Sequence, residues 1–469
     1  MLFSSISFLY YFLPPAIGLY FAVPQRFKNA VLLLASLVFY GWGEPRYVLL
    51  MGLSVLSGYG FGLLVEKYRQ KGIGRMLCGI SVSVSLSFLL YFKYADFFIE
   101  NFNAVAGILK FSKISPLRLA LPIGISFYTF QIISYTVDVY RGEAAQKNLI
   151  DLSAYIAMFP QLIAGPIVRY HEIADQLRDR EHSLSGAAYG IRRFVIGLAK
   201  KILIANQLGE LCSVFRASGE KSVLFYWMYA VAFCLHIYFD FSGYSDMAIG
   251  LGRVFGFRFP ENFNYPYISA SITEFWRRWH ISLGSWFRDY VYIPLGGNRK
   301  GRGRQLVNIL LVWMLTGFWH GAAWNFILWG LFFAVLLMAE KLWLLKRLES
   351  SRLFSRIYTL FFVMISFVIF HAENLGQAFS DIAGLFGAGG IPLVSAEAVY
   401  YLRSFGIVFL AGGIGATPAF RGLLRKVSEN PAGAKVLNLM EPAALALLLL
   451  VMTAYLVDGS FNPFLYFRF

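Results

Sequence analysis

Two histidines stand in tryptophan-rich, apolar segments of the chain, where an ionisable side chain is unusual. His320 lies in the segment 316–324, TGFWHGAAW, and His280 lies in the segment 275–282, FWRRWHIS. Imidazole has a pKa near neutrality, so it can remove a proton from a hydroxyl group at physiological pH, as acyl transfer requires. The residues alone leave two interpretations of each histidine open. His320 is either catalytic or a structural group between helices, and His280 either assists it or packs at a membrane interface.

Three aspartates, Asp138, Asp240 and Asp246, also lie in apolar surroundings, and the last two flank the segment 242–245, SGYS. Carboxylates at membrane depth are candidates for a functional site because burying their charge is costly. Such acids would suit a proton-coupled transporter. They would equally suit a structural hydrogen-bond network with Tyr238 and Ser245, so they do not discriminate between these classes of protein.

The segment 296–304, GGNRKGRGR, is basic and rich in glycine. It lacks the GxxxxGK[ST] pattern, which excludes a P-loop. It either contacts the phosphates of coenzyme A or an acidic carrier protein, or it serves as a positively charged cytoplasmic anchor. The chain also has no HEXXH or GxSxG motif, and its three cysteines form no CxxC pair, so we expect no bound metal.

The composition of the chain favours lipid as the solvent around the elements that carry these residues. Of 469 residues, 58% are hydrophobic and 14% are charged, whereas soluble domains carry about a quarter charged residues. A membrane-spanning helix needs about 20 apolar residues, and long apolar stretches occur at 46–66, 76–92, 223–239, 357–370 and 441–457. We expect an all-α integral membrane protein with roughly ten to twelve passes, formed as a single polytopic membrane domain over residues 1–469.

The net charge of +16 is concentrated in short loops. Loops that keep lysine and arginine are cytoplasmic by the positive-inside rule, so this charge indicates orientation in a membrane rather than nucleic-acid binding. The stretch 371–397 contains no lysine or arginine and should face the outside. If the N-terminus also starts outside, the loops alternate consistently and the tail 458–469 is extracytoplasmic.

Two regions around the histidines interrupt the pattern of spans. Residues 261–304 are aromatic, basic and punctuated by glycine, too polar to cross lipid. Half-inserted or non-helical backbone at membrane depth must be buried in protein or line a cavity. Residues 305–345 are apolar and have basic loops on both sides, so we expect them to enter and return as a helical hairpin with His320 at its turn.

Longer motifs in this part of the chain resemble the membrane-bound O-acyltransferase (MBOAT) superfamily. They are PENFNYP at 260–266, TEFWRRWH at 273–280, WFRDY at 286–290 and TGFWHG at 316–321, with GISF at 124–127 and GPIV at 165–168. The densest match runs from about residue 124 to 331. The motifs are most similar to those of the alginate O-acetylation branch, and the D-alanyl transfer proteins of teichoic acid modification are more distant.

This resemblance implies a fold and a site that the spacing of residues does not establish. The fold would be a helical ring with re-entrant and amphipathic helices around a central tunnel. His320 would be the catalytic histidine of the family, and His280 would stand at its second histidine-or-asparagine position. Further candidates for lining the tunnel or contacting the substrate are Trp276, Arg277, Trp279, Asn264, Asp240, Tyr244, Trp319 and Trp324.

The resemblance also implies an acyl donor, an acceptor and a partner. The donor would be cytosolic acetyl-CoA, used as a substrate with no bound cofactor. The final acceptor would be an exported polysaccharide, reached with an extracytoplasmic acetyltransferase partner of the esterase type. The chain would then act as an O-acetyltransferase in the bacterial inner membrane. The rivals are a transporter or flippase for a polysaccharide precursor, and a non-catalytic scaffold in which His320 is replaceable.

The C-terminal residues 464–469, FLYFRF, resemble a short aromatic motif of this branch, Phe-x-Tyr-x-x-Phe. In that motif a tyrosine is proposed to relay the acyl group, and Tyr466 occupies its position. An ester of a phenol is more reactive than an alkyl ester, so onward transfer from tyrosine is easy. The alternative is an aromatic anchor at the membrane interface.

Overall fold

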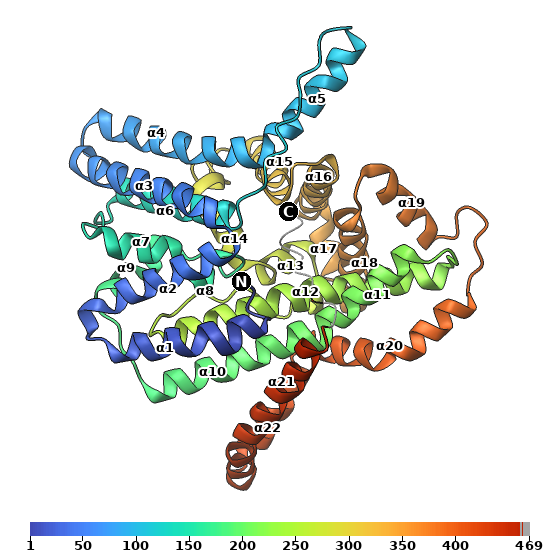
Figure 1. Ribbon diagram of the computed structural model, residues 1–469. Helices are drawn as coiled ribbons and strands as arrows, with labels where there is room; N and C mark the ends of the chain where they lie inside the picture. The colour runs from blue at the N-terminus through green and yellow to red at the C-terminus, as the bar shows by residue number, and fades with distance from the viewer. Residues whose placement is uncertain (460–461, 463–469) are drawn as a thin grey trace. The chain divides into compact units, whose positions relative to one another are not determined.

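The protein is built from helices, with no β-strand among the residues that the computed structural model describes, 1–459 and 462 (Figure 1). This confirms the all-α class expected from the sequence. The chain forms two compact units, Met1–Gly190 with Leu251–Pro260, and Ile191–Gly250 with Glu261–Phe469. The chain passes between the units within α10 (Leu184–Ala199), within α12 (Val223–Val254) and again between Pro260 and Glu261.

The first unit contains three long helices that lie side by side, α3, α4 and α6 (Figure 1). Their close approach depends on small residues, since Gly58 and Gly62 of α3 face the side chains of Ile132 and Tyr135 of α6. The α-helices of this unit are α1 (Leu13–Ala22), α2 (Lys28–Gly43), α3 (Val48–Tyr68), α4 (Gly72–Leu89), α5 (Ala95–Ile108), α6 (Ile125–Arg141), α7 (Leu149–Ala157), α8 (Phe159–Leu162) and α9 (Tyr170–Arg178).

The second unit holds both histidines and is assembled around an aromatic core that includes Phe233, Trp279, Trp329 and Phe367. Its α-helices, in addition to most of α12, are α11 (Asn206–Ala217), α13 (Ile272–Arg278), α14 (Ile281–Phe287), α15 (Arg302–His320), α16 (Trp324–Ala339), α17 (Leu345–Leu348), α18 (Arg352–His371), α19 (Leu375–Leu385), α20 (Ala396–Gly415), α21 (Ala419–Glu429) and α22 (Pro431–Val457).

Short π- and 3₁₀-helices extend or join these elements in both units. The π-helical segments are Ser7–Phe12, Leu90–Tyr94, Lys200–Ala205, Arg288–Tyr292 and Glu340–Leu344, and the 3₁₀ segments are Gln25–Phe27, Pro45–Tyr47 and Pro266–Ile268.

Seven helices in the described part of the chain are long and apolar enough to cross a membrane. They include all five apolar stretches identified in the sequence, which confirms a multi-pass membrane protein. The number is smaller than the expected ten to twelve because other long helices are too short or too polar: α6 has 17 residues and includes Gln131 and Asp138. Burial differs widely among the seven, from 72% for α12 to 6% for α22, which leaves α22 nearly all its surface for lipid.

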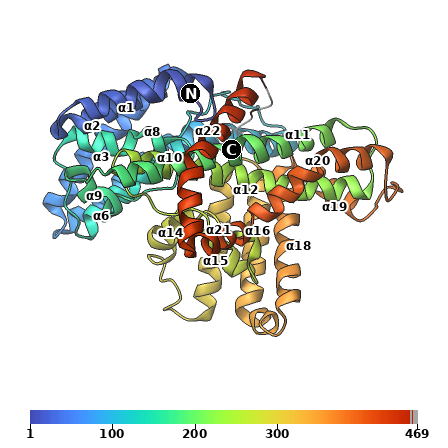
Figure 2. The ribbon, with the colours of Figure 1, turned by 90° about the horizontal axis from the view of Figure 1, so that it is seen from below.

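The region that interrupts the spans, 261–304, folds into the short helices α13 and α14 and a glycine-rich turn. It is followed by the expected helical hairpin, because α15 and α16 pack against each other along their length (Figure 2). His320 is the last residue of α15, and residues 321–323 form the turn. The prediction that places His320 at the tip of a hairpin is confirmed.

Candidate active site

The hairpin of α15 and α16 is held tightly closed just before His320. A Cβ atom added to Gly317 would overlap the Phe326 carbonyl oxygen, and one added to Gly330 would overlap the Trp313 carbonyl oxygen. Only glycine permits backbones to approach this closely, so these two positions fix how α15 lies on α16. The consequence is a rigid platform for the side chain at the end of α15.

The imidazole of His320 lies among aromatic rings. Its centroid is 5.1 Å from the Trp329 ring and 5.3 Å from the Phe370 ring, and both contacts are edge-to-face. The ring of Trp319, the preceding residue, lies 4.9 Å from the His320 ring. His320 itself is partly accessible, whereas Trp329 is 1% exposed. The surroundings therefore have a low dielectric but leave a path to the imidazole, as a general base needs.

His280 lies at the junction of α13 and α14, in a left-handed backbone conformation with φ 45° and ψ 53°. This conformation is uncommon for a residue other than glycine, and strain of about 1–3 kcal/mol is often found at functional sites. The side chain is 2% exposed, and burial lowers the pKa of His280 to about 3. Its Nδ1 lies 3.0 Å from Asn262 Oδ1.

The structure brings the two histidines to the same tryptophan. The Trp319 ring is 4.9 Å from the His320 ring and 6.2 Å from the His280 ring. The Trp319 indole therefore contacts both imidazole rings.

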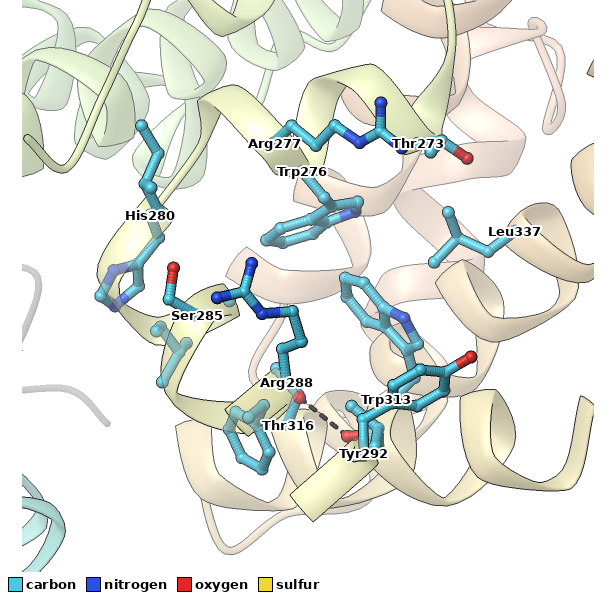
Figure 3. Close-up of a pocket in the computed structure, with 15 residues that line it drawn as sticks. Thr273, Trp276, Arg277, His280, Ser285, Arg288, Tyr292, Trp313, Thr316 and Leu337 are labelled. Carbon is cyan, nitrogen blue, oxygen red and sulfur yellow. Dashed lines mark hydrogen bonds between the residues drawn. The ribbon is translucent and has the colours of Figure 1, made fainter. Parts of the chain in front are cut away.

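A cavity of about 510 Å³ adjoins this arrangement (Figure 3). Figure 3 shows side chains from α13, α14 and α15 around it, with two tryptophans and two arginines on its wall. Thr316 lies on this wall one helical turn before His320, so both side chains project from the same face of α15. His320 is not itself among the lining residues, which are Thr273, Trp276, Arg277, His280, Ile281, Leu283, Gly284, Ser285, Phe287, Arg288, Tyr292, Val312, Trp313, Thr316 and Leu337.

Comparisons with known proteins agree with the motifs around the two histidines. A family model described as MBOAT, membrane-bound O-acyltransferase family, matches residues 136–376. The probable alginate O-acetylase AlgI of Azotobacter vinelandii is 39% identical over 500 residues, which cover 100% of both chains. The peptidoglycan O-acetyltransferase of Helicobacter pylori is 32% identical and covers 100% of this chain and 98% of its own. The teichoic acid D-alanyltransferase of Bacillus subtilis is 31% identical over 55% of this chain and 70% of its own.

The chain belongs to the membrane-bound O-acyltransferase family. The matched residues 136–376 include both histidines, the whole hairpin and every residue that lines the cavity. The family predicted from the sequence motifs is confirmed.

Of the further residues expected to line an MBOAT tunnel, Trp276 and Arg277 line the cavity and Trp319 contacts both histidines. Trp279 is instead stacked on Phe275 in the core. The others lie outside the lining of this cavity and stay predictions: Asn264 is exposed, Trp324 is 55% exposed, and Asp240 and Tyr244 are buried in α12.

The three aspartates are each placed beside a basic side chain. Asp240 pairs with Lys201 at 2.6 Å, and both side chains are almost fully buried. Asp246 pairs with Arg193 at 2.8 Å and Lys200 at 2.6 Å. These ion pairs join α12 to α10 and to the π-helical segment that follows it.

In the first unit, Asp138 lies 2.8 Å from His171 Nδ1. The hydrogen bond from His171 to this carboxylate raises the pKa of His171, against an opposing effect of burial. The sequence does not indicate this pair, because Asp138 lies 33 positions before His171 in the chain.

Two residues that position the side chains of the candidate site could not be identified from the sequence. Glu340, at the end of the apolar α16, is 1% exposed and accepts hydrogen bonds from the backbone nitrogens of Ile272 and Thr273 at 2.6 and 2.9 Å. It thereby caps the N-terminus of α13, which carries Trp276 and Arg277. The one indication in the sequence that Glu340 has a structural role is its position as a single acidic residue directly after an apolar helix. Asn262 belongs to the PENFNYP motif, but the sequence does not indicate that its side chain contacts His280.

Among the residues that the structure describes, no group of three or more His, Cys, Asp or Glu side chains is arranged to hold a metal ion. Tyr466 lies outside the described residues. The nearest described residue of the tail is Asn462, whose Oδ1 accepts a hydrogen bond from Asn206 Nδ2 at 3.1 Å.

Proposed function

We propose that this protein is an inner-membrane O-acetyltransferase that takes an acetyl group from cytosolic acetyl-CoA and passes it on for O-acetylation of an exported polysaccharide. The observation that carries the proposal is the placement of His320. It is a partly accessible imidazole at the tip of a rigid hairpin, shares Trp319 with a second histidine, and projects from the same helix face as the wall of a cavity. Relatives that cover the whole chain act on alginate or peptidoglycan, as their names state.

In the proposed reaction His320 is the general base. Its unprotonated nitrogen removes the proton of an acceptor hydroxyl while the hydroxyl oxygen attacks the carbonyl carbon of the thioester. The carbon–sulfur bond then breaks, and the imidazolium returns the proton to the thiolate that leaves. The products are an acetyl ester and the free thiol of coenzyme A, so atoms and protons balance without another reactant.

The cavity beside α13 and α14 is the proposed site of the acyl donor. Its volume of about 510 Å³ is in the range of small-molecule sites, and its wall combines indoles with two guanidinium groups. Arg288 is engaged by Asp289 at 2.7 Å. Arg277 is exposed and forms no ion pair with any residue in the described part of the chain, so it is available for a phosphate of the donor.

Tyr466 is the proposed acyl relay, in a tail that we place on the extracytoplasmic side. The bond between Asn206 and Asn462 supports a tail that returns to the protein four residues before Tyr466. In the relay, the phenol oxygen takes the acetyl group from the thioester and later gives it to a hydroxyl of the partner or of the polysaccharide.

The relay is tested by replacing Tyr466 with phenylalanine, which removes the phenol oxygen and keeps the ring. Polysaccharide acetylation in cells should be lost, and label from radioactive acetyl-CoA should no longer be recovered in the C-terminal peptide. The matched control is Tyr455→Phe in α22. Unchanged acetylation in the Tyr466→Phe strain would rule out the relay.

The function is tested in cells by measuring export and acetylation separately, which also distinguishes the transporter alternative. In a strain that carries only the His320→Ala protein, we expect normal amounts of extracellular polysaccharide with no O-acetyl groups. If the amount of extracellular polysaccharide falls together with its acetylation, and precursor accumulates inside the cell, the result would favour a transporter. If acetylation persists in this strain, His320 is dispensable, which is the result expected of a non-catalytic scaffold.

A further inference from the structure

The backbone around His280 is fixed by two hydrogen bonds to the segment that precedes α13. The Ile281 nitrogen donates to the Asn262 carbonyl oxygen at 2.9 Å, and the Asn264 nitrogen donates to the Arg278 carbonyl oxygen at 2.9 Å. The left-handed turn at His280 is therefore held from both sides. As a result the direction of the His280 Cα–Cβ bond is fixed relative to the segment that precedes α13.

The orientation of the Asn262 side-chain amide follows from its partners. Its Oδ1 lies 3.3 Å from the Ser282 backbone nitrogen and 2.9 Å from Ser282 Oγ, and its Nδ2 donates to Ser245 Oγ at 3.0 Å. A backbone N–H can only donate, so the amide atom that faces it must be the oxygen. Asn262 is 1% exposed, which leaves no room for the reverse orientation to be rescued by solvent.

This orientation decides where the proton on His280 lies. Nδ1 is 3.0 Å from Asn262 Oδ1, an oxygen that can only accept, so Nδ1 must carry the hydrogen. Since burial lowers the pKa of His280 to about 3, the ring is neutral and has no second proton. Nε2 is thus an acceptor, and it is buried with no hydrogen-bond partner among the described residues.

We propose that Asn262 is a positioning residue that holds His280, a residue that lines the cavity, in the Nδ1–H tautomer, so that Nε2 is left as the hydrogen-bond acceptor for an N–H or O–H group of the bound substrate. The inference about the substrate rests on the proposed function. The tautomer itself does not. In this arrangement His280 is an acceptor that orients substrate, and it is not the acid that protonates the leaving thiol, because it has no proton to give at Nε2.

The tautomer is tested without reference to activity, by nitrogen-15 NMR of the full chain labelled at its six histidines. We expect His280 to contribute one protonated Nδ1 signal and one unprotonated Nε2 signal, both unchanged between pH 5 and pH 8. Their loss in His280→Asn assigns them. A protonated Nε2, or a pair that titrates in this range, would overturn the proposal.

The role of Asn262 is tested by two substitutions in protein reconstituted in lipid. Asn262→Asp keeps an oxygen that accepts from Nδ1–H and Ser282, so kcat/KM for acetyl-CoA should stay within about threefold of wild type near neutral pH. Its added negative charge favours the imidazolium, so the acidic limb of the pH profile should move to higher pH. Asn262→Leu removes the acceptor and should lower kcat/KM at least roughly tenfold, with a mixture of His280 tautomers by NMR.

A purely structural role for Asn262 predicts a different result: both variants lose activity in proportion to lost folded protein, and the pH profile does not move. That result would refute the positioning role. If wild type consumes no acetyl-CoA, the proposed function fails, while the NMR spectra still decide whether Asn262 sets the tautomer.

Discussion

Arg277 and Arg278 are neighbours on α13 that differ in what they contact. Arg277 lines the cavity and forms no ion pair in the described chain, whereas Arg278 is held by Glu274 at 2.8 Å and does not line the cavity. The sequence gives no way to tell them apart, because both are arginines in the same basic motif. Their difference arises from the direction in which each helix position points.

We predict that Arg277→Ala raises the KM for acetyl-CoA about tenfold, which corresponds to about 1.4 kcal/mol, with a smaller effect on kcat. The increase should shrink at high ionic strength because salt screens an exposed charge. Steady-state kinetics of the reconstituted protein measure this, with Arg278→Ala as the matched control. Equal effects of the two substitutions on KM would show that Arg277 does not bind the donor.

The pair of His171 and Asp138 predicts a pH dependence of stability in the first unit. The pKa of His171 is raised in the folded protein by the hydrogen bond to Asp138, above its value of about 6.5 in the unfolded chain. The stabilisation is therefore fully present below about pH 6.5 and is lost as the pH rises through the raised pKa. The thermal unfolding midpoint should fall over that window in wild type. His171→Gln should remove this part of the fall, and an unaltered profile would contradict the assignment.

At the scale of helices, the hairpin of α15 and α16 was predictable and the network behind it was not. Apolar residues between two basic loops, with glycines around His320, required a segment that enters and returns. The partners of the buried charges could not be predicted, because Lys201 and Asp240 lie on different helices and meet only through tertiary packing. The left-handed conformation of His280 has no local signal either, since positive φ is normally encoded by glycine or asparagine.

The glycine contact in the hairpin gives a test with a control on the same helix. Gly317→Ala should destabilise the protein by about 1–3 kcal/mol, because the added methyl group meets the Phe326 carbonyl oxygen and separates the helices. It should also lower activity by displacing His320. Gly303→Ala, also in α15, has nothing within 4 Å of the added Cβ and should be neutral or slightly stabilising. Thermal unfolding of both variants in detergent measures this, and equal midpoints would contradict the close-packing account.

For the molecule as a whole, composition and the lengths of the apolar stretches predicted an all-α membrane protein, and the motifs predicted its family; both predictions are confirmed. Seven helices in the described part of the chain have the length and hydropathy of a membrane span, fewer than the ten to twelve passes expected, because helices such as α6 are shorter and contain polar residues. The cavity, the shared tryptophan and the cap by Glu340 required the three-dimensional structure, since each joins segments separated along the chain.

Acyl transfer by His320 is measured directly as release of coenzyme A from radiolabelled acetyl-CoA by the purified protein in lipid. We predict that wild type releases coenzyme A and that His320→Ala lowers the rate on the order of a hundredfold or more, the usual effect of removing a general base. Equal rates for wild type and a folded His320→Ala protein would contradict the account.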